Sequence, residues 1–263
     1  MSLVESAAVR TDSGHADAVV KLDGVSKTYG RGGNALLALD RVSLTAQRGE
    51  FVCLLGASGC GKSTLLSLVA GLDEPTGGTL DITGHRVSLM FQEAALFPWL
   101  SVAGNVELAL RLRGVGRRER RERAAQLLET VRLHDFGHKR PHELSGGMRQ
   151  RVALARALAQ DADVLLMDEP FGALDAMTRD ILHDELERIW RERSLTVLFV
   201  THNVREAVRL GDRVILLSSR PGRIIEDFAV RQPRPRRIDS PEVSGLAAEI
   251  TDRLRAEVSR HAH

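Results

Sequence analysis

The sequence has little of several features that would place a protein in a special class. Among 263 residues there are only two cysteines, Cys53 and Cys60, which excludes a disulfide framework and fits a reducing compartment. No apolar run approaches the roughly 20 residues needed to span a bilayer, and residues 1–18 lack the apolar core of an export signal. The net charge is only +2, with 37 basic and 35 acidic residues, so no nucleic-acid partner is expected.

The remaining composition is that of a globular protein in which strands and helices alternate. We expect a disordered tail over residues 1–18 and a single domain over residues 19–230. Within that domain, short apolar strands alternate with helices, which predicts a mostly parallel sheet covered by helices on both sides. Residues from about 100 to 146 are helical and strongly charged, and we expect an inserted helical subdomain there. Residues 231–263 are predicted to form a basic linker and a charged helix.

A glycine-rich loop follows the apolar strand Phe51–Leu55. Glycines let consecutive backbone N–H groups converge on one anion, and a helix starting near Gly61 points its positive end at the same place. We expect Lys62 to reach the β- and γ-phosphates of a nucleotide and Ser63 to ligate Mg²⁺. The whole stretch matches the phosphate-loop pattern: Gly56, Ala57, Ser58, Gly59, Cys60, Gly61, Lys62, Ser63 and Thr64.

The phosphate loop leaves several alternatives open when it is taken alone. An ordinary glycine-rich turn has the same composition, and kinases, GTPases and helicases carry the same motif. Cys60 is either a low-pKa thiol at a helix N-terminus or simply a small residue at a tolerant position.

A second apolar strand, Val164–Met167, ends in two neighbouring carboxylates. We expect Asp168 to hold the hydrated Mg²⁺, and Glu169 to act as the general base that orients and deprotonates the attacking water. The alternative is a surface strand that ends in acidic residues where it meets solvent. The two motifs together favour nucleotide hydrolysis.

The stretch Leu144–Gln150 places Ser145, Gly146 and Gly147 at a helix N-terminus, which is another potential anion site as well as an ordinary serine N-cap. It resembles the signature loop of ATP-binding-cassette (ABC) proteins. The resemblance covers roughly residues 19–228. It implies an α/β fold: a P-loop NTPase (RecA-like) core with an N-terminal antiparallel β-lobe and an inserted α-helical subdomain.

The same resemblance implies roles for further residues. Tyr29 matches the aromatic residue that stacks on adenine. Gln92 matches the glutamine that joins Mg²⁺ and the attacking water to the helical subdomain. Asp175, in Ala173-Leu174-Asp175, matches the loop that crosses between subunits, and His202 matches the switch histidine that contacts the γ-phosphate. The family works as a head-to-tail dimer, so a homodimer that sandwiches two ATP molecules is implied.

Two segments, Phe91–Trp99 and Ser219–Ile224, resemble the ATPases of bacterial nitrate, taurine and aliphatic-sulfonate importers. This implies a peripheral subunit at the cytoplasmic face of the membrane, under a separate permease that works with a solute-binding protein. Phe97 and Trp99 then form either a docking surface for the permease or a cap on the helical subdomain. A soluble ABC-type ATPase acting on nucleic acid or ribosomes is the competing hypothesis, although such relatives usually carry two cassettes or long coiled-coil insertions.

Two segments complete the predictions. Only thirty residues separate Lys62 from Gln92, which is short for the family, and Thr79–Ser88 is predicted to be a strand hairpin in the β-lobe. The basic stretch Arg231–Arg237 is interpreted as a charged linker, with contact to anionic lipid as the alternative. We expect His134, His138 and His142 to face solvent rather than to bind a metal.

Overall fold

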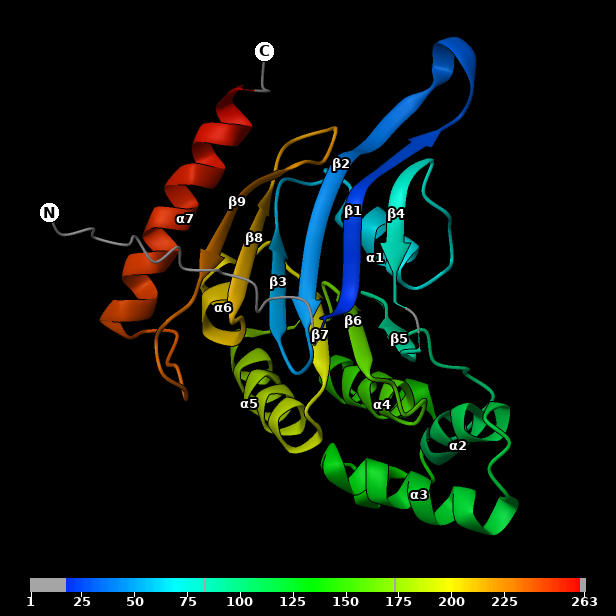
Figure 1. Ribbon diagram of the computed structural model, residues 1–263. Coiled ribbons are helices and arrows are strands. Elements are labelled where there is room, and N and C mark those ends of the chain that lie inside the picture. Colours follow the sequence, from blue (N-terminus) through cyan, green and yellow to red (C-terminus); the bar gives the residue numbers. More distant parts are fainter. Residues whose placement is uncertain (1–17, 83, 173, 261–263) are drawn as a thin grey trace, which may run out of the picture.

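The computed structural model describes residues 18–82, 84–172 and 174–260, and its chain is organised around two β-sheets (Figure 1). The smaller sheet is antiparallel and has the order β2-β1-β4. It consists of β1 (Ala18–Tyr29), β2 (Leu36–Gln47) and β4 (Gly77–Asp81). The predicted tail lies outside the described residues, except for its last residue, Ala18, which begins β1.

The larger sheet has six strands in the order β5-β6-β7-β3-β8-β9. All neighbouring pairs are parallel except β8 and β9. Every residue of β3 and β7 is buried, which explains why both strands are apolar except for Thr196 at the start of β7. The strands are β3 (Phe51–Leu55), β5 (Val87–Met90), β6 (Val164–Asp168), β7 (Thr196–Val200), β8 (Arg213–Leu217) and β9 (Ile224–Ala229).

The helices cover this sheet and extend it at one end. In Figure 1, α2 and α3 lie together at the end opposite the tip of the β1–β2 hairpin, and α7 lies beside α6 and β9. Both α2 and α3 come between β5 and β6 in the chain, so they form an insertion into the core fold. The helices are α1 (Lys62–Val69), α2 (Val102–Leu112), α3 (Arg117–Thr130), α4 (Gly146–Leu158), α5 (Ala176–Arg193), α6 (Val204–Leu210) and α7 (Pro241–Arg260).

This arrangement confirms the predicted fold class, with its antiparallel lobe, its mixed core sheet and its helical insertion. Because β3, β6 and β7 are parallel neighbours in the core sheet, their carboxyl ends lie at one edge. The residues that follow these strands are therefore brought together, which is the usual position of a ligand site in an open α/β sheet. No helix in the described ranges is both long and apolar enough to cross a membrane.

The prediction of a hairpin over Thr79–Ser88 is wrong. β4 pairs with β1 in the small sheet, whereas β5 pairs with β6 in the core sheet. The chain therefore passes from one sheet to the other at this point. Both Ser88 and Met90 are buried, and Leu89 packs against the core, so the strand belongs inside the larger sheet rather than in a lobe with one solvated face.

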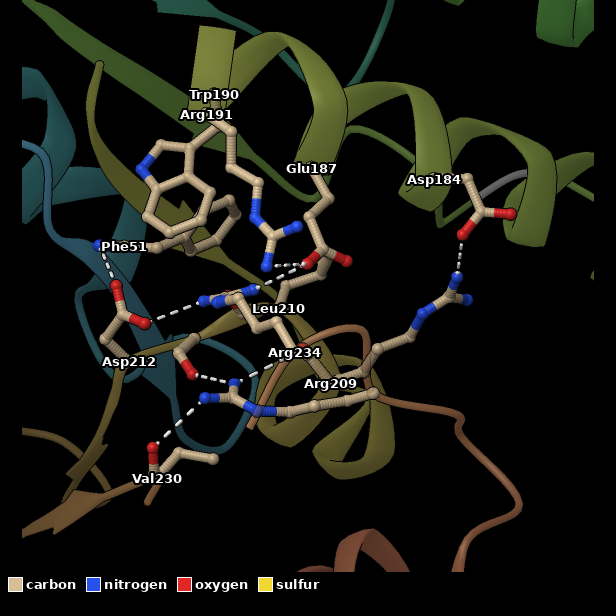
Figure 2. A network of polar contacts seen from close by, with 12 residues as sticks. Phe51, Asp184, Glu187, Trp190, Arg191, Arg209, Leu210, Asp212, Val230 and Arg234 are labelled. Carbon is tan, nitrogen blue, oxygen red and sulfur yellow. Dashed lines mark hydrogen bonds and ion pairs between the residues drawn. The ribbon is translucent and has the colours of Figure 1, made fainter. Parts of the chain in front are cut away.

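The basic stretch Arg231–Arg237 is more structured than either interpretation of the sequence proposed. The Arg236 side chain is buried and donates hydrogen bonds to the backbone carbonyls of Val208, Gly211 and Val230. Burial lowers the pKa of Arg236 to about 10, so the guanidinium remains charged near neutral pH. In Figure 2, Arg234 lies among Trp190, Glu187 and Asp212. The linker is therefore fastened to the core by two of its own arginines.

Candidate active site

The phosphate loop connects β3 to α1 and depends on glycine at defined positions. Gly59 and Gly61 have φ values of 74° and 97°, in the left-handed region that favours glycine. A Cβ at Gly61 would also lie 2.7 Å from Cδ2 of Leu39. The Lys62 ammonium lies inside the loop, where it donates hydrogen bonds to the carbonyls of Gly56 and Ala57, both at 2.9 Å. The loop thus has the backbone shape and the buried cation of an anion site.

The segment after β8 supports this loop, a role that the sequence did not indicate. Arg220 donates a hydrogen bond from Nε to the carbonyl of Gly59 at 3.2 Å. A Cβ at Gly222 would lie 2.2 Å from the carbonyl oxygen of Cys60, so only glycine fits there. In the sequence, the segment Ser219–Ile224 indicated only a resemblance to one branch of a family. A single sequence does not show which distant residues a loop contacts.

Cys60 is a buried residue of the phosphate loop, 1% exposed. Burial raises the pKa of its thiol, and the nearby Lys62 acts in the opposite direction with a smaller effect. This does not support a reactive thiolate and agrees with the alternative of a small residue that the site tolerates. Ser58, by contrast, is exposed beside it, and Thr64 is partly exposed in the first turn of α1.

The carboxyl ends of β6 and β7 contribute the acidic and imidazole groups. Asp168 makes a side-chain hydrogen bond with Ser63. Burial raises the pKa of Asp168, an effect that this hydrogen bond partly offsets. Oε2 of Glu169 lies 2.9 Å from Nδ1 of His202. The structure therefore brings together four of the predicted residues: Ser63, Asp168, Glu169 and His202.

Gln92 lies after β5, and the structure connects it to α4. Its side chain is exposed, and its backbone carbonyl accepts a hydrogen bond of 2.8 Å from Nε2 of Gln150. A cavity of about 440 Å³ is lined by Gln92, Leu96, Gly146 and Leu174, among others. Gln92 is thus placed between the core sheet and the helix that begins at the Ser145 motif.

The Ser145 motif and the loop before α5 pack against each other. The Ser145 hydroxyl caps α4 by accepting a hydrogen bond from the Met148 N–H at 3.3 Å. Asp175 caps α5 by accepting one from the Thr178 N–H at 2.9 Å. A Cβ at Gly147 would lie 2.4 Å from Cγ2 of Thr178, so the two helix starts touch. Ala173, the first residue of the predicted crossing loop, lies outside the described residues.

The two predicted anion sites are not joined within one chain. Among the described residues, no hydrogen bond or ion pair connects Ser145–Gly147 with Gly56–Thr64. Tyr29 also lies apart, at the end of β1, where its ring is 40% exposed and its hydroxyl donates a hydrogen bond to Asp73 at 3.0 Å. The described residues hold no cluster of three or more His, Cys, Asp or Glu side chains that would bind a metal.

Comparison with known proteins agrees with this geometry. Residues 39–172 match the family model described as ABC transporter. The chain is 48% identical to the nitrate import ATP-binding protein NrtD of Synechocystis sp., over 76% of this chain and 77% of that protein. It is 50% identical to the taurine import ATP-binding protein TauB of Burkholderia thailandensis (79% and 84% covered). It is 45% identical to the aliphatic sulfonates import ATP-binding protein SsuB 1 of Burkholderia cenocepacia (97% and 78% covered).

A solved structure extends the comparison to three dimensions. It is a dimeric, post-hydrolysis state of an ATP-binding cassette bound to ADP and Pi, with a TM-score of 0.73 and 35% identity. The match covers 81% of this chain and 100% of the chain in that structure. The resemblance read from the sequence is confirmed, and these findings do not support an ATPase of nucleic acid or ribosomes. The chain belongs to the ABC transporter family, as one of its ATP-binding and ATP-hydrolysing subunits.

Proposed function

We propose that this ATPase drives the import of a small solute with an oxyanion group, namely nitrate, taurine or another sulfonate, through a separate permease. The proposal rests on relatives that are about half identical and are named as import ATP-binding proteins for these solutes. Two copies of the chain would lie at the cytoplasmic face of the membrane. The residues that select the solute would belong to the permease and to an accompanying solute-binding protein.

The Glu169–His202 contact at 2.9 Å, next to the phosphate loop, is the observation that carries the proposed hydrolysis. Glu169 takes a proton from the attacking water while the water oxygen bonds to the γ-phosphorus. The bond from that phosphorus to the β–γ bridging oxygen breaks, which gives ADP and phosphate. His202 contacts the γ-phosphate, and Lys62 with the loop N–H groups holds the β- and γ-phosphates.

Ser63, Gln92 and Asp168 have the oxygen donors that Mg²⁺ prefers. The Ser63–Asp168 hydrogen bond places two of these donors side by side, and Asp168 is partly withdrawn from solvent. This donor set fits Mg²⁺, which would supply charge neutralisation at the phosphates when bound. Gln92 would be the donor that also connects the site to α4, through its carbonyl and Gln150.

A head-to-tail homodimer would complete the site. The Ser145–Gly147 turn would face the phosphate loop of the second copy, with the Asp175 loop crossing between the subunits and Tyr29 against the adenine. Two observations support this arrangement. The signature turn and the phosphate loop are not connected within one chain, and the similar solved cassette is dimeric. Closure of the dimer around ATP would then be the movement passed to the permease.

The segment after Gln92 would receive the permease. The rings of Phe97 and Trp99 pack against each other at a tilt of 50°, with centroids 5.4 Å apart, yet Trp99 remains 68% exposed. The loop has a fixed shape, because Asn105 is buried and hydrogen-bonds both the N–H and the carbonyl of Phe97. Arg156 also donates to the carbonyls of Ala94 and Ala95. A rigid loop with an exposed aromatic residue is a suitable anchor for a protein partner.

The test is co-purification with a Glu169→Gln variant, which should bind ATP, fail to hydrolyse it and accumulate as a closed dimer. A matched Glu129→Gln variant, altered at an exposed position on α3, controls for the loss of charge. Membranes solubilised with ATP should yield a polytopic permease in about equal amount, together with a solute-binding protein that identifies the solute. Hydrolysis by Glu169→Gln at the parental rate would show that the base is another residue. Recovery with ribosomes or DNA and no permease would overturn the import proposal alone.

A further inference from the structure

A buried group of polar side chains lies directly behind the Glu169–His202 pair. His183 on α5 is 0% exposed, Thr201 is 3% exposed and Glu206 on α6 is 4% exposed. Thr201 and Glu206 also line a small cavity together with Glu169 and His202. Burial of three polar side chains is unfavourable unless they satisfy one another, so the hydrogen bonds among them fix their positions.

Glu206 accepts hydrogen bonds on both of its oxygens. Oε1 lies 2.5 Å from Nε2 of His183, and Oε2 accepts a hydrogen bond from the hydroxyl of Thr201. The Thr201 oxygen in turn accepts a hydrogen bond of 3.0 Å from the backbone N–H of Asn203. Both carboxylate oxygens of Glu206 are therefore paired, and the Thr201 oxygen has two partners.

Arg209 determines which nitrogen of His183 carries the proton. Nη1 of Arg209 lies 3.1 Å from Nδ1 of His183. A guanidinium has donors only, so Nδ1 must accept a hydrogen bond from Arg209. The ring proton is then on Nε2 and is donated to Glu206. Arg209 is itself held by Asp180 and Asp184, the latter visible in Figure 2. His183 thus requires an acceptor at residue 206, and the second carboxylate oxygen of Glu206 accepts from the Thr201 hydroxyl, so an apolar side chain at this position would leave both donors unpaired.

This series of hydrogen bonds ends beside the Glu169–His202 pair. Thr201 immediately precedes His202, and its N–H donates a hydrogen bond of 3.3 Å to the carbonyl of Leu54, just before the phosphate loop. Apart from its backbone, Thr201 is anchored by the hydrogen bonds of its hydroxyl to Glu206 and from the Asn203 N–H. The direction in which the exposed His202 side chain leaves the chain thus depends on the bond between Thr201 and Glu206.

We propose that Glu206, oriented by His183, is a positioning residue that fixes Thr201 and thereby aims His202 at the γ-phosphate. This inference rests on the roles proposed above for Glu169 and His202. It adds a link from α5, which begins at the Asp175 loop, to the position of His202. Such a residue acts on the rate of the chemical step rather than on nucleotide binding.

The test is steady-state ATP hydrolysis by the purified full chain, with ATP affinity measured separately by a fluorescent nucleotide. Glu206→Leu, which removes both acceptors, should lower kcat between about 10-fold and 100-fold, as small displacements of catalytic groups do, and change the Kd for ATP less than about twofold. His183→Gln supplies the matched control, because its amide can donate to Glu206 and accept from Arg209 as the imidazole does. It should retain the parental kcat, whereas His183→Leu should behave like Glu206→Leu.

A second pair of variants covers the case in which Glu206→Leu does not fold. Thr201→Ser keeps the hydroxyl and should retain kcat, whereas Thr201→Val removes it and should lose kcat at unchanged ATP affinity. His202→Ala in the same assay separates the two levels of the argument. If His202→Ala hydrolyses ATP at the parental rate, the proposed role of His202 fails. If His202→Ala is impaired while the Glu206 and Thr201 variants are not, or if His183→Gln is as impaired as His183→Leu, the positioning role is refuted.

Discussion

Replacing Arg234 by alanine should destabilise the folded protein strongly, although the residue lies in a segment that the sequence presents as a linker. Its side chain is 8% exposed. The guanidinium carbon lies 4.4 Å from the centre of the Trp190 ring (Figure 2). Nη2 of Arg234 donates hydrogen bonds to the Leu210 carbonyl and, at 2.8 Å, to Asp212. The Glu187 carboxylate lies 3.5 Å from Nη1 of Arg234. One side chain therefore joins α5, the end of α6 and the linker.

The magnitude follows from what the substitution leaves behind. A charge-assisted hydrogen bond contributes about 1.5–3 kcal/mol, and a desolvated cation–π contact about 2 kcal/mol. Part of this gain offsets the cost of burying the guanidinium, so the terms do not simply add. Glu187, which is 7% exposed, would keep Arg191 at 3.6 Å as its one ion-pair partner among the described residues. Removing one partner of a buried ion pair costs about 3–5 kcal/mol, which corresponds to a melting temperature lower by about 10 °C for a chain of this length.

Differential scanning fluorimetry and urea unfolding of the purified chain provide the assay. Arg237→Ala is the matched control, because Arg237 lies in the same segment but is 81% exposed and pairs only with Asp239, two residues away. It should change the free energy of unfolding by less than about 0.5 kcal/mol. Arg234→Lys should recover part of the loss, because an ammonium pairs with Asp212 but cannot stack flat on Trp190. A loss of 1 kcal/mol lowers the melting temperature of a chain of this length by at least about 2 °C. If Arg234→Ala melts within about 2 °C of the parent, the anchoring argument is wrong.

Three further outcomes are expected. Gly147→Ala should cost about 1–3 kcal/mol of stability, because the new Cβ would lie 2.4 Å from Cγ2 of Thr178. Thr178→Ser removes that methyl group, and in a double-mutant cycle it should restore most of the lost stability. Burial raises the pKa values of the Cys53 and Cys60 thiols, so iodoacetamide should label both slowly in the native protein and rapidly after denaturation. The labelling is followed by mass spectrometry at a pH of about 7.5, roughly one unit below the pKa of a free thiol. Fast labelling of the native protein would contradict the burial argument. Trp99→Ala should leave basal ATP hydrolysis unchanged and reduce the permease recovered in co-purification, since its ring is 68% exposed and outside the nucleotide site.

Local sequence determined much of the architecture. The strand Phe51–Leu55 was predicted with the bounds that the structure shows, because a strand buried on both faces has a continuous apolar sequence. Ser145 was predicted as an N-cap and does accept a hydrogen bond from the Met148 N–H. The phosphate loop could be found for a similar reason, since its glycines and Lys62 are consecutive in the chain and their chemistry is local.

Predictions failed where the partner of a segment decides its structure. The short strand Val87–Met90 has no local feature that selects one sheet over another, and its pairing with β6 depends on where the rest of the chain lies. The same holds for Arg234 and Arg236, whose charge suggested solvent or lipid. Their partners come from α5, from α6 and from Val230, just after β9, segments that only the folded chain brings to the linker.

The sequence by itself determined the family, the fold class and the residues that carry the candidate chemistry, because these depend on short motifs in a fixed order. Only the tertiary structure decided which groups support them. Arg220 and Gly222 lie more than a hundred positions from the phosphate loop in the chain yet contact it. His183 and Glu206, from two different helices, are connected by hydrogen bonds to Thr201, the residue before His202. Hydrogen bonding and close packing act over a few ångströms in space, whatever the separation along the chain, so one sequence does not reveal these contacts.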